Sequence, residues 1–412
     1  MTISGIVVCS TCEQKIKLRH QVGVIYPVKV NIPCNKCGKI LKGEVVMNAE
    51  KAFVFPEENV TMEFDDADQA ISISTELPIL KNETNVVFPA LTPFLAISRV
   101  FTFDEIRKHS HNLQEFQSIR EEKLSHLITS YELFENQNWL YYLNHLKRHF
   151  DDDIDIIESF EYSSVMLVSL NEIIFSHLRT SYYKKEFDDK LFRKLIYKNS
   201  SKINNLKALN VEINQYIDLK DEFIKGVKLL EIFLKNANSF LPTILLSYKN
   251  DFEKSFGADL DITTFDFAEL KHMFIEQFEY LSRVSSLYFG LLNLNENGDF
   301  NNFGSVRGCS DLLDYCSKDN GVKKDFIKRQ LFLNGYFLNT LNSQIRNGIG
   351  HLKTKYDPKT QIIKYFPYKV PEKKDEFKEI YLIDFAYLVY QQSLKVHDSL
   401  RIMAKFFDLI KP

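Results

Sequence analysis

Two Cys-x-x-Cys pairs lie within the first 37 residues of this 412-residue chain, one formed by Cys9 and Cys12 and the other by Cys34 and Cys37. Each pair follows a short apolar stretch of extended character, at residues 6–8 and 28–32. A gap of two residues turns the chain so that both thiolates face one ion, and four thiolates complete a tetrahedral Zn²⁺ site. The spacing therefore predicts a zinc ribbon over residues 1–48, with Gly38 at the positive backbone angle that such turns often need.

The predicted zinc is structural, because four cysteine ligands leave no coordination position open for a substrate. Redox chemistry is disfavoured, since the βαβ context of redox Cys-x-x-Cys pairs is missing. Cys309 and Cys316 stand apart from these pairs and are expected to be free thiols. We interpret the basic residues near the zinc ligands mainly as a solvated face, with phosphate or a partner as the alternative; they are Lys15, Lys17, Arg19, His20, Lys36, Lys39 and Lys42.

The overall charge gives no general attraction to nucleic acid. Lys and Arg total 52 and Asp and Glu total 55, a formal net charge of −3, so any nucleic-acid site has to be local. No apolar run approaches the roughly 20 residues that span a bilayer, and the start of the chain lacks a basic segment followed by an apolar one. The expectation is a soluble, cytoplasmic protein without a membrane partner.

The rest of the chain is predicted to be mainly α-helical, in the form of a helical bundle. Short apolar stretches separated by Pro, Asn and Asp predict a β-rich segment over residues 49–105. Beyond it, apolar residues recur with helical periodicity, which predicts a helical region over 106–263 and a second helical domain over 264–412. The long helices are expected at residues 113–134, 162–183, 206–234, 267–292 and 326–352. Asp266 and Glu269 have capping-box spacing at the start of the fourth of these.

One octamer near the C-terminus contains candidate functional residues: Gln344-Ile345-Arg346-Asn347-Gly348-Ile349-Gly350-His351. Arginine and histidine separated by four to six residues are expected about once by chance in this composition, and Arg120 and His126 give a second match. Arg120 is followed by two glutamates, which would repel phosphate, whereas Arg346 is followed by an amide. Context therefore favours Arg346 and His351 as an anion site.

Gly348 and Gly350 lie late in a helical pattern, where each destabilises a helix by about 1 kcal/mol relative to Ala. They indicate either the close approach of a second backbone or a helix that ends there. Beyond His351, residues 355–365 predict two short strands around an Asp-Pro-Lys-Thr turn. Asp384 is predicted to cap a final helix that runs to residue 407.

The residues Arg346 to His351, followed by a hairpin and a closing helix, resemble HEPN-superfamily proteins, particularly ribonucleases of bacterial anti-phage and abortive-infection systems. The resemblance covers residues 264–412 and implies a helical bundle that dimerises and places two arginine-histidine motifs across one cleft. It implies metal-independent cleavage of RNA, with Arg346, Asn347 and His351 as the catalytic residues. Lys353 stands where some family members carry a tyrosine, so regulation through that tyrosine is not expected here.

The function expected from these features is that of an endoribonuclease and toxin-like effector of anti-phage defence, restrained until a phage-derived or cellular activator is present. The alternative is a non-catalytic protein in which a zinc ribbon and a helical scaffold bind a partner or nucleic acid. A metal hydrolase is a weaker alternative, because the histidines lack a His-Glu-x-x-His arrangement. His145 and His149 have helical ligand spacing without a paired acidic ligand, and we interpret them as surface residues.

Overall fold

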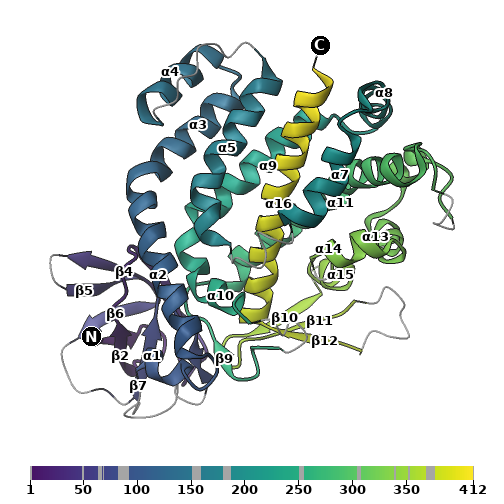
Figure 1. Cartoon of the computed structure of the whole chain (residues 1–412). Coiled ribbons are helices and arrows are strands. Elements are labelled where there is room, and N and C mark those ends of the chain that lie inside the picture. Colours follow the sequence, from purple (N-terminus) through teal and green to yellow (C-terminus); the bar gives the residue numbers. More distant parts are fainter. Residues whose placement is uncertain are drawn as a thin grey trace. The chain divides into compact units, whose positions relative to one another are not determined.

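The computed structural model describes residues 2–48, 51–63, 67, 69–81, 92–150, 159–179, 187–249, 255–303, 308–337, 340–350, 353–367 and 376–411. The fold is mainly α with several small β-sheets, as the sequence predicted (Figure 1). The chain divides into two compact units, each assembled from three segments. Unit 1 comprises Met1–Gln117, Lys235–His272 and Gln344–Tyr390, and unit 2 comprises Ser118–Leu234, Met273–Ser343 and Gln391–Pro412.

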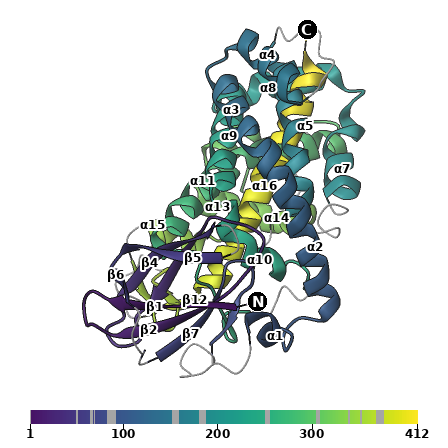
Figure 2. The ribbon, with the colours of Figure 1, turned by 90° about the vertical axis from the view of Figure 1, so that its left-hand side faces the viewer.

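Unit 1 contains two sheets built from the N-terminal strands (Figure 2). One sheet has the order β6-β1-β2-β7, in which β7 is parallel to β2 and the other pairs are antiparallel. The other has the antiparallel order β3-β4-β5. The strands are β1 (Thr2–Cys9), β2 (Lys15–Gln21), β3 (Val28–Pro33), β4 (Ile40–Asn48), β5 (Lys51–Glu58), β6 (Val60–Glu63) and β7 (Gln69–Ser74).

The two sheets share one apolar core, because alternate residues of each strand point to the same face. In β2, Ile16 and Leu18 are buried, while the alternating basic residues Lys15, Lys17 and Arg19 are only partly buried. The core also takes in the thiols of Cys9 and Cys34. Extended structure was correctly predicted for residues 6–8 and 28–32. The strands after residue 49, β5 to β7, pair with strands that precede it. The division of the chain into four domains stays a prediction.

The remainder of unit 1 comprises helices and two further small sheets, β8-β9 and β10-β11-β12. The elements are β8 (Ile79–Leu80), which pairs with β9 (Leu260–Asp261), then α1 (Pro93–Ile97), α2 (Phe103–Ile119), η5 (Ala237–Phe240), α10 (Leu241–Leu246) and the antiparallel sheet β10-β11-β12. The strands β10 (Thr354–Asp357) and β11 (Ile362–Tyr365) confirm the predicted hairpin, and β12 (Lys378–Tyr381) adds a third strand. Residues 82–91 of the predicted β-rich segment, which include an apolar stretch at 86–88, lie outside the described residues.

Unit 2 is helical. Its elements include η2 (Arg120–Leu124), α3 (Ser125–Glu135), α4 (Trp139–His149), α5 (Phe160–Leu178), η3 (Phe187–Phe192), α7 (Arg193–Leu195), η4 (Tyr197–Asn199), α8 (Ile203–Asn214), α9 (Leu219–Lys235), α12 (Leu312–Ser317), α13 (Asn320–Arg329) and α14 (Leu331–Phe337). Most of α11 (Phe267–Asn297) and of α16 (Leu382–Ile410) also belongs to it. Phe175 of α5 packs against Phe233 of α9 and His397 of α16, at ring distances of 5.8 and 4.1 Å.

Two of the predicted long helices are broken, so those predictions were wrong. The one expected at 206–234 is interrupted between α8 and α9, where the side chain of Asn214 accepts from the backbone N–H of Leu219. The one expected at 326–352 consists of α13, α14 and α15 (Ser343–Gly350). Gln330 adopts an extended conformation after α13, and its side chain accepts from the N–H groups of Phe332 and Leu333. Capping by polar side chains therefore ends helices that apolar periodicity alone would continue.

Helix caps were also predicted at the N-terminal ends of two other helices, α11 and α16. Asp266 accepts from the N–H of Ala268 and caps α11, as predicted. Glu269 is paired with Lys29 at 3.0 Å. The prediction for Asp384 was wrong, because α16 starts two residues earlier and Asp384 lies in its first turn. Its carboxylate accepts from the backbone N–H groups of Phe256 and Gly257, so it anchors a neighbouring segment of unit 1 instead.

Among the described helices, no single one combines the length and apolarity that a membrane span requires, although α9 and the bent continuation through η5 and α10 meet the criterion jointly.

Candidate functional site

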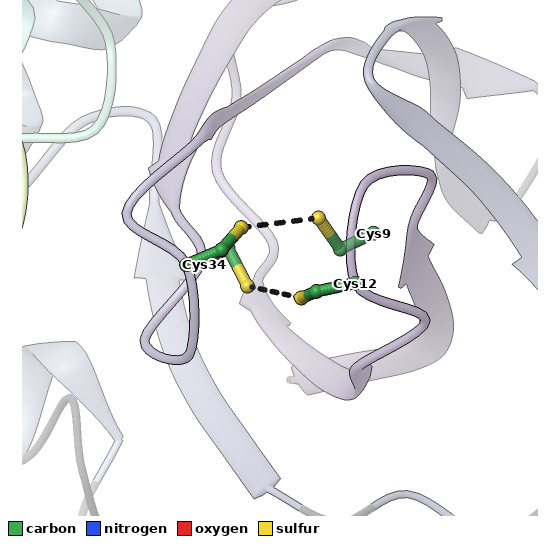
Figure 3. A group of neighbouring side chains, drawn as sticks. Cys9, Cys12 and Cys34 are labelled. Atoms are coloured by element: carbon green, nitrogen blue, oxygen red, sulfur yellow. Dashed lines mark hydrogen bonds between the residues drawn. The ribbon is translucent and has the colours of Figure 1, made fainter.

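The four N-terminal cysteines come together between the ends of β1 and β3 (Figure 3). Their sulfur atoms all lie within 4.8 Å of one another, with 3.7 Å between Cys9 and Cys37 and 3.5 Å between Cys12 and Cys34. No disulfide joins them. Four sulfurs about 2.3 Å from a tetrahedral ion would be separated by roughly 3.8 Å, so the spacing fits a four-thiolate metal site.

Two equivalent turns present these thiols. In the first, Cys9 N–H donates to Gln14 O at 3.0 Å and Glu13 N–H donates to Cys9 O at 2.8 Å. In the second, Cys34 N–H donates to Lys39 O at 2.8 Å and Gly38 N–H donates to Cys34 O at 2.7 Å. The residue four positions after the first cysteine has a positive φ in both turns, 60° at Glu13 and 76° at Gly38. The positive angle predicted for Gly38 is confirmed.

The thiols differ in their surroundings. Cys9 and Cys34 are buried, while Cys37 is exposed. Burial raises the pKa of the Cys34 thiol to about 12, and the backbone N–H of Lys39 lowers the pKa of Cys37 to about 7. A bound cation would deprotonate all four thiols, because metal binding displaces their protons. The site therefore has two ligands that are shielded from water and at least one that water reaches.

Three of the basic residues around the cysteines make contacts within unit 1. His20 is buried and contacts the hydroxyl of Tyr26 at 3.1 Å, and burial lowers its pKa to about 4. Lys42 pairs with Asp266 at 3.0 Å and with Glu58 at 3.3 Å. Lys36 donates to the backbone of Cys12 at 3.4 Å. These three side chains are thus engaged inside unit 1, and the prediction of a solvated face was wrong for His20, which is buried.

Arg346 and Asn347 lie on α15, an eight-residue helix. Ile345 and Ile349 bury one face of this helix, whereas Arg346 and Asn347 are half-buried on its other side. A Cβ added at Gly350 would lie 3.9 Å from Cζ of Arg346, so the guanidinium lies over the last turn of the helix. His351, the third predicted site residue, lies outside the described residues.

Gly348 marks a close approach between α15 and the hairpin. A Cβ at this position would lie 2.8 Å from Cβ of Tyr365 and 3.4 Å from the backbone N of Phe366. The carbonyl of Gly348 also accepts from the N–H of Lys353 at 2.8 Å. Both interpretations of the glycines apply, because Gly348 admits a second backbone and Gly350 is the final residue of the helix.

Three histidines gather where α3 and α4 meet. The rings of His126 and His149 stack at 3.6 Å, and Nε2 of His145 contacts the carbonyl of His126 at 2.9 Å. His149 and His145 were predicted to be surface residues, and all three are half-buried. In the part of the chain that the structure describes, the four cysteines are the group whose ligand atoms converge as a metal site requires.

A buried polar network in unit 2 was missed in the sequence. Arg179 donates to Asp398 at 2.5 Å and contacts Nδ1 of His397 at 2.5 Å, while Tyr336 donates to Asp398 at 2.8 Å. Burial and the neighbouring arginines lower the pKa of His397 well below its usual value. Arg179, Tyr336 and the adjacent pair His397 and Asp398 come from three distant parts of the sequence, so only the fold reveals the network.

Comparisons of this chain with models of protein families, with curated proteins and with solved structures find no match.

Proposed function

We propose that the chain is a metal-independent endoribonuclease that acts as a homodimer through Arg346, Asn347 and His351. The observation that supports the proposal is the order α15, hairpin, α16, with Arg346 half-buried on α15 and its guanidinium over the last turn of that helix. An arginine in this setting suits an anionic substrate, because its guanidinium can donate two parallel hydrogen bonds to one phosphate. The resemblance of residues 264–412 to HEPN ribonucleases supplies the reaction.

RNA cleavage without a metal uses the 2′-hydroxyl as nucleophile. A base removes its proton, its oxygen bonds to phosphorus, and the bond from phosphorus to the 5′-oxygen breaks as an acid protonates the leaving group. Histidine suits both proton transfers, since its unperturbed pKa of about 6.5 makes both forms available near neutrality. We assign base and acid to the two copies of His351 in the dimer.

Arg346 then stabilises the developing charge on the phosphorane, and Asn347 holds either the phosphate or the imidazole. Because one chain supplies only one histidine of this motif, dimerisation is part of catalysis. We further propose that the protein serves anti-phage defence and is weakly active without an activator, since cleavage of host RNA has to be restrained until needed.

For the cysteine site, we propose that the ion is Zn²⁺ and that its role is structural. The sulfur separations fit the tetrahedral geometry that zinc adopts with thiolates. The site is saturated by its four ligands, so the ion organises the turns at Cys9–Glu13 and Cys34–Gly38 and takes no part in RNA cleavage.

The test compares wild type with Arg346→Ala, His351→Ala and the matched control Arg120→Ala. Arg120 belongs to the other arginine-histidine pair and lies in η2. Each protein is produced at high level in bacteria, and growth and total RNA are followed. We expect RNA breakdown and growth arrest with wild type and Arg120→Ala, reduced at least 100-fold in the other two. Equal behaviour of all four proteins under activating conditions would favour a non-catalytic scaffold.

A further inference from the structure

The four thiols of the cysteine site differ in how easily a solute can reach them. Cys9 and Cys34 are fully buried, at 0% exposure, and belong to the apolar core of the two N-terminal sheets. Cys12 is half-buried, whereas Cys37 is exposed. A small reagent in solution therefore meets the sulfur of Cys37 first.

The turn that carries Cys37 has positive charge on its exposed side. Lys36 directly precedes Cys37 and Lys39 follows two residues later, and both lysines are exposed. Lys359 of the hairpin turn is exposed as well, and its Nζ donates to the carbonyl of Lys36 at 3.2 Å. Cysteines that react with oxidants are typically accessible to water and have cationic neighbours. Cys37 meets both conditions.

Cys37 also has a thiol of the other turn close by. Its sulfur lies 3.7 Å from the sulfur of Cys9. Cys12 and Cys34 form a similar pair at 3.5 Å. A disulfide bond measures about 2.05 Å, so the first pair has to approach by roughly 1.7 Å to form one. Rotation of the two side chains can supply a movement of this size.

We propose that Cys37 is a site of oxidative modification, at which hydrogen peroxide reacts and causes the chain to release its metal ion. Cysteines that bind a metal are thiolates. The sulfur of Cys37 attacks one oxygen of hydrogen peroxide, and the O–O bond breaks. Hydroxide leaves, and a sulfenic acid remains on Cys37.

Cys9 completes the reaction. Its thiolate attacks the sulfenic sulfur of Cys37, the S–O bond breaks, and a second hydroxide leaves as the disulfide forms. In total, two thiolates are oxidised to one disulfide and one hydrogen peroxide is reduced to two hydroxide ions. This differs from redox Cys-x-x-Cys chemistry, because the disulfide joins the two turns and not the two cysteines of one pair.

The disulfide removes half of the metal ligands. Cys12 and Cys34 are left from the tetrahedral set, and two thiolates are too few to hold the ion tightly. Loss of the ion should loosen the two N-terminal sheets, because the binding energy of a structural zinc site is also folding energy. The chain thereby converts exposure to peroxide into loss of order in unit 1.

The reaction can be followed without measuring RNA cleavage. Zinc-loaded full-length protein is treated with a small excess of hydrogen peroxide, and zinc release is recorded with a chromogenic chelator against a sample without peroxide. We expect release of one zinc per chain, and peptide mapping should find Cys9 joined to Cys37 as the first disulfide. Retention of the zinc, or a first disulfide between other cysteines, would overturn the proposal.

Two variants that each replace one ligand by histidine locate the reactive thiol. Zinc sites accept three cysteines and one histidine, so Cys37→His and the matched control Cys12→His should each retain the ion. Because Cys37→His lacks the exposed thiol, its zinc release under peroxide should be slower by roughly tenfold or more. Cys12→His keeps both reacting thiols, so its release should stay within about twofold of wild type.

Equal release rates from the two zinc-loaded variants would contradict the proposal. The peptide map of the wild type does not depend on these variants, so it decides the question even if one of them fails to bind zinc.

Discussion

The cysteine site and the Arg346 segment differ in how much of a site one chain supplies. The four thiols come from two equivalent turns whose backbone hydrogen bonds have the same pattern, and they converge within 4.8 Å. Arg346 and Asn347 occupy a single short helix, which rests on the hairpin through Gly348. The first site is complete within one chain, while the second, as we propose, needs a second copy. A metal site can thus be recognised from the short spacing of its ligands in one sequence. A site that two chains share also depends on how the chains assemble.

Loss of a cysteine ligand is expected to have the largest effect. Cys9→Ser should abolish zinc binding and unfold the two N-terminal sheets, because metal binding to structural zinc sites is worth about 10–16 kcal/mol in small peptides at pH 7. Metal content of the purified protein and its circular dichroism provide the measurement.

Two control variants show whether loss of zinc is specific to the four cysteine ligands and separate from loss of RNA cleavage. Cys309→Ser, at a free thiol outside the metal site, should retain one zinc per chain. Arg346→Ala should also retain it while losing RNA cleavage. If Cys9→Ser bound zinc stoichiometrically and kept the stability of wild type, the four-thiolate site would be wrong.

Substitution of Gly348, where α15 contacts the hairpin, should lower the free energy of unfolding by an intermediate amount. Gly348→Ala places a methyl group 2.8 Å from Cβ of Tyr365, so α15 has to shift, and overpacking of this kind costs about 1–3 kcal/mol. Gly350→Ala meets its nearest neighbour at 3.9 Å and should change the free energy of unfolding little. Urea denaturation of both variants separates these outcomes. Equal stability of the two would contradict the close packing of α15 on β11.

Substitutions at the positive-φ residues of the two cysteine turns should change the free energy of unfolding least, and with opposite signs. Glu13 adopts a positive φ without being glycine, so Glu13→Gly should remove strain and stabilise the protein by up to about 1 kcal/mol. Gly38→Ala should introduce a similar strain and destabilise it by about 1–2 kcal/mol. Chemical denaturation of the zinc-loaded protein measures both changes. Destabilisation by Glu13→Gly would show that the two turns are not equivalent.

Local sequence patterns predicted the parts of the fold that depend on neighbouring residues. The strands before each cysteine pair, the positive angle at Gly38 and the hairpin around residues 358–361 follow from short-range chemistry. The helix breaks at Asn214 and Gln330 were missed, because side-chain caps interrupt an apolar pattern that continues across them.

Contacts between residues that are far apart in the sequence could not be predicted. Asp384 has the spacing of a helix cap, yet it binds the backbone at Phe256 and Gly257, more than a hundred residues away. Arg179, Tyr336 and Asp398 likewise meet in one buried network from three separate stretches of the chain. Such sites arise from tertiary packing, for which a single sequence carries no periodic signal.

The most direct test of the proposed activity is the chemistry of the RNA ends that the full-length protein forms in EDTA, with circular dichroism verifying that the fold persists. Our account predicts 2′,3′-cyclic phosphate ends from wild type and none from Arg346→Ala or His351→Ala. Ends that carry a free 3′-hydroxyl, cleavage that requires added Mg²⁺, or cleavage of DNA would contradict it.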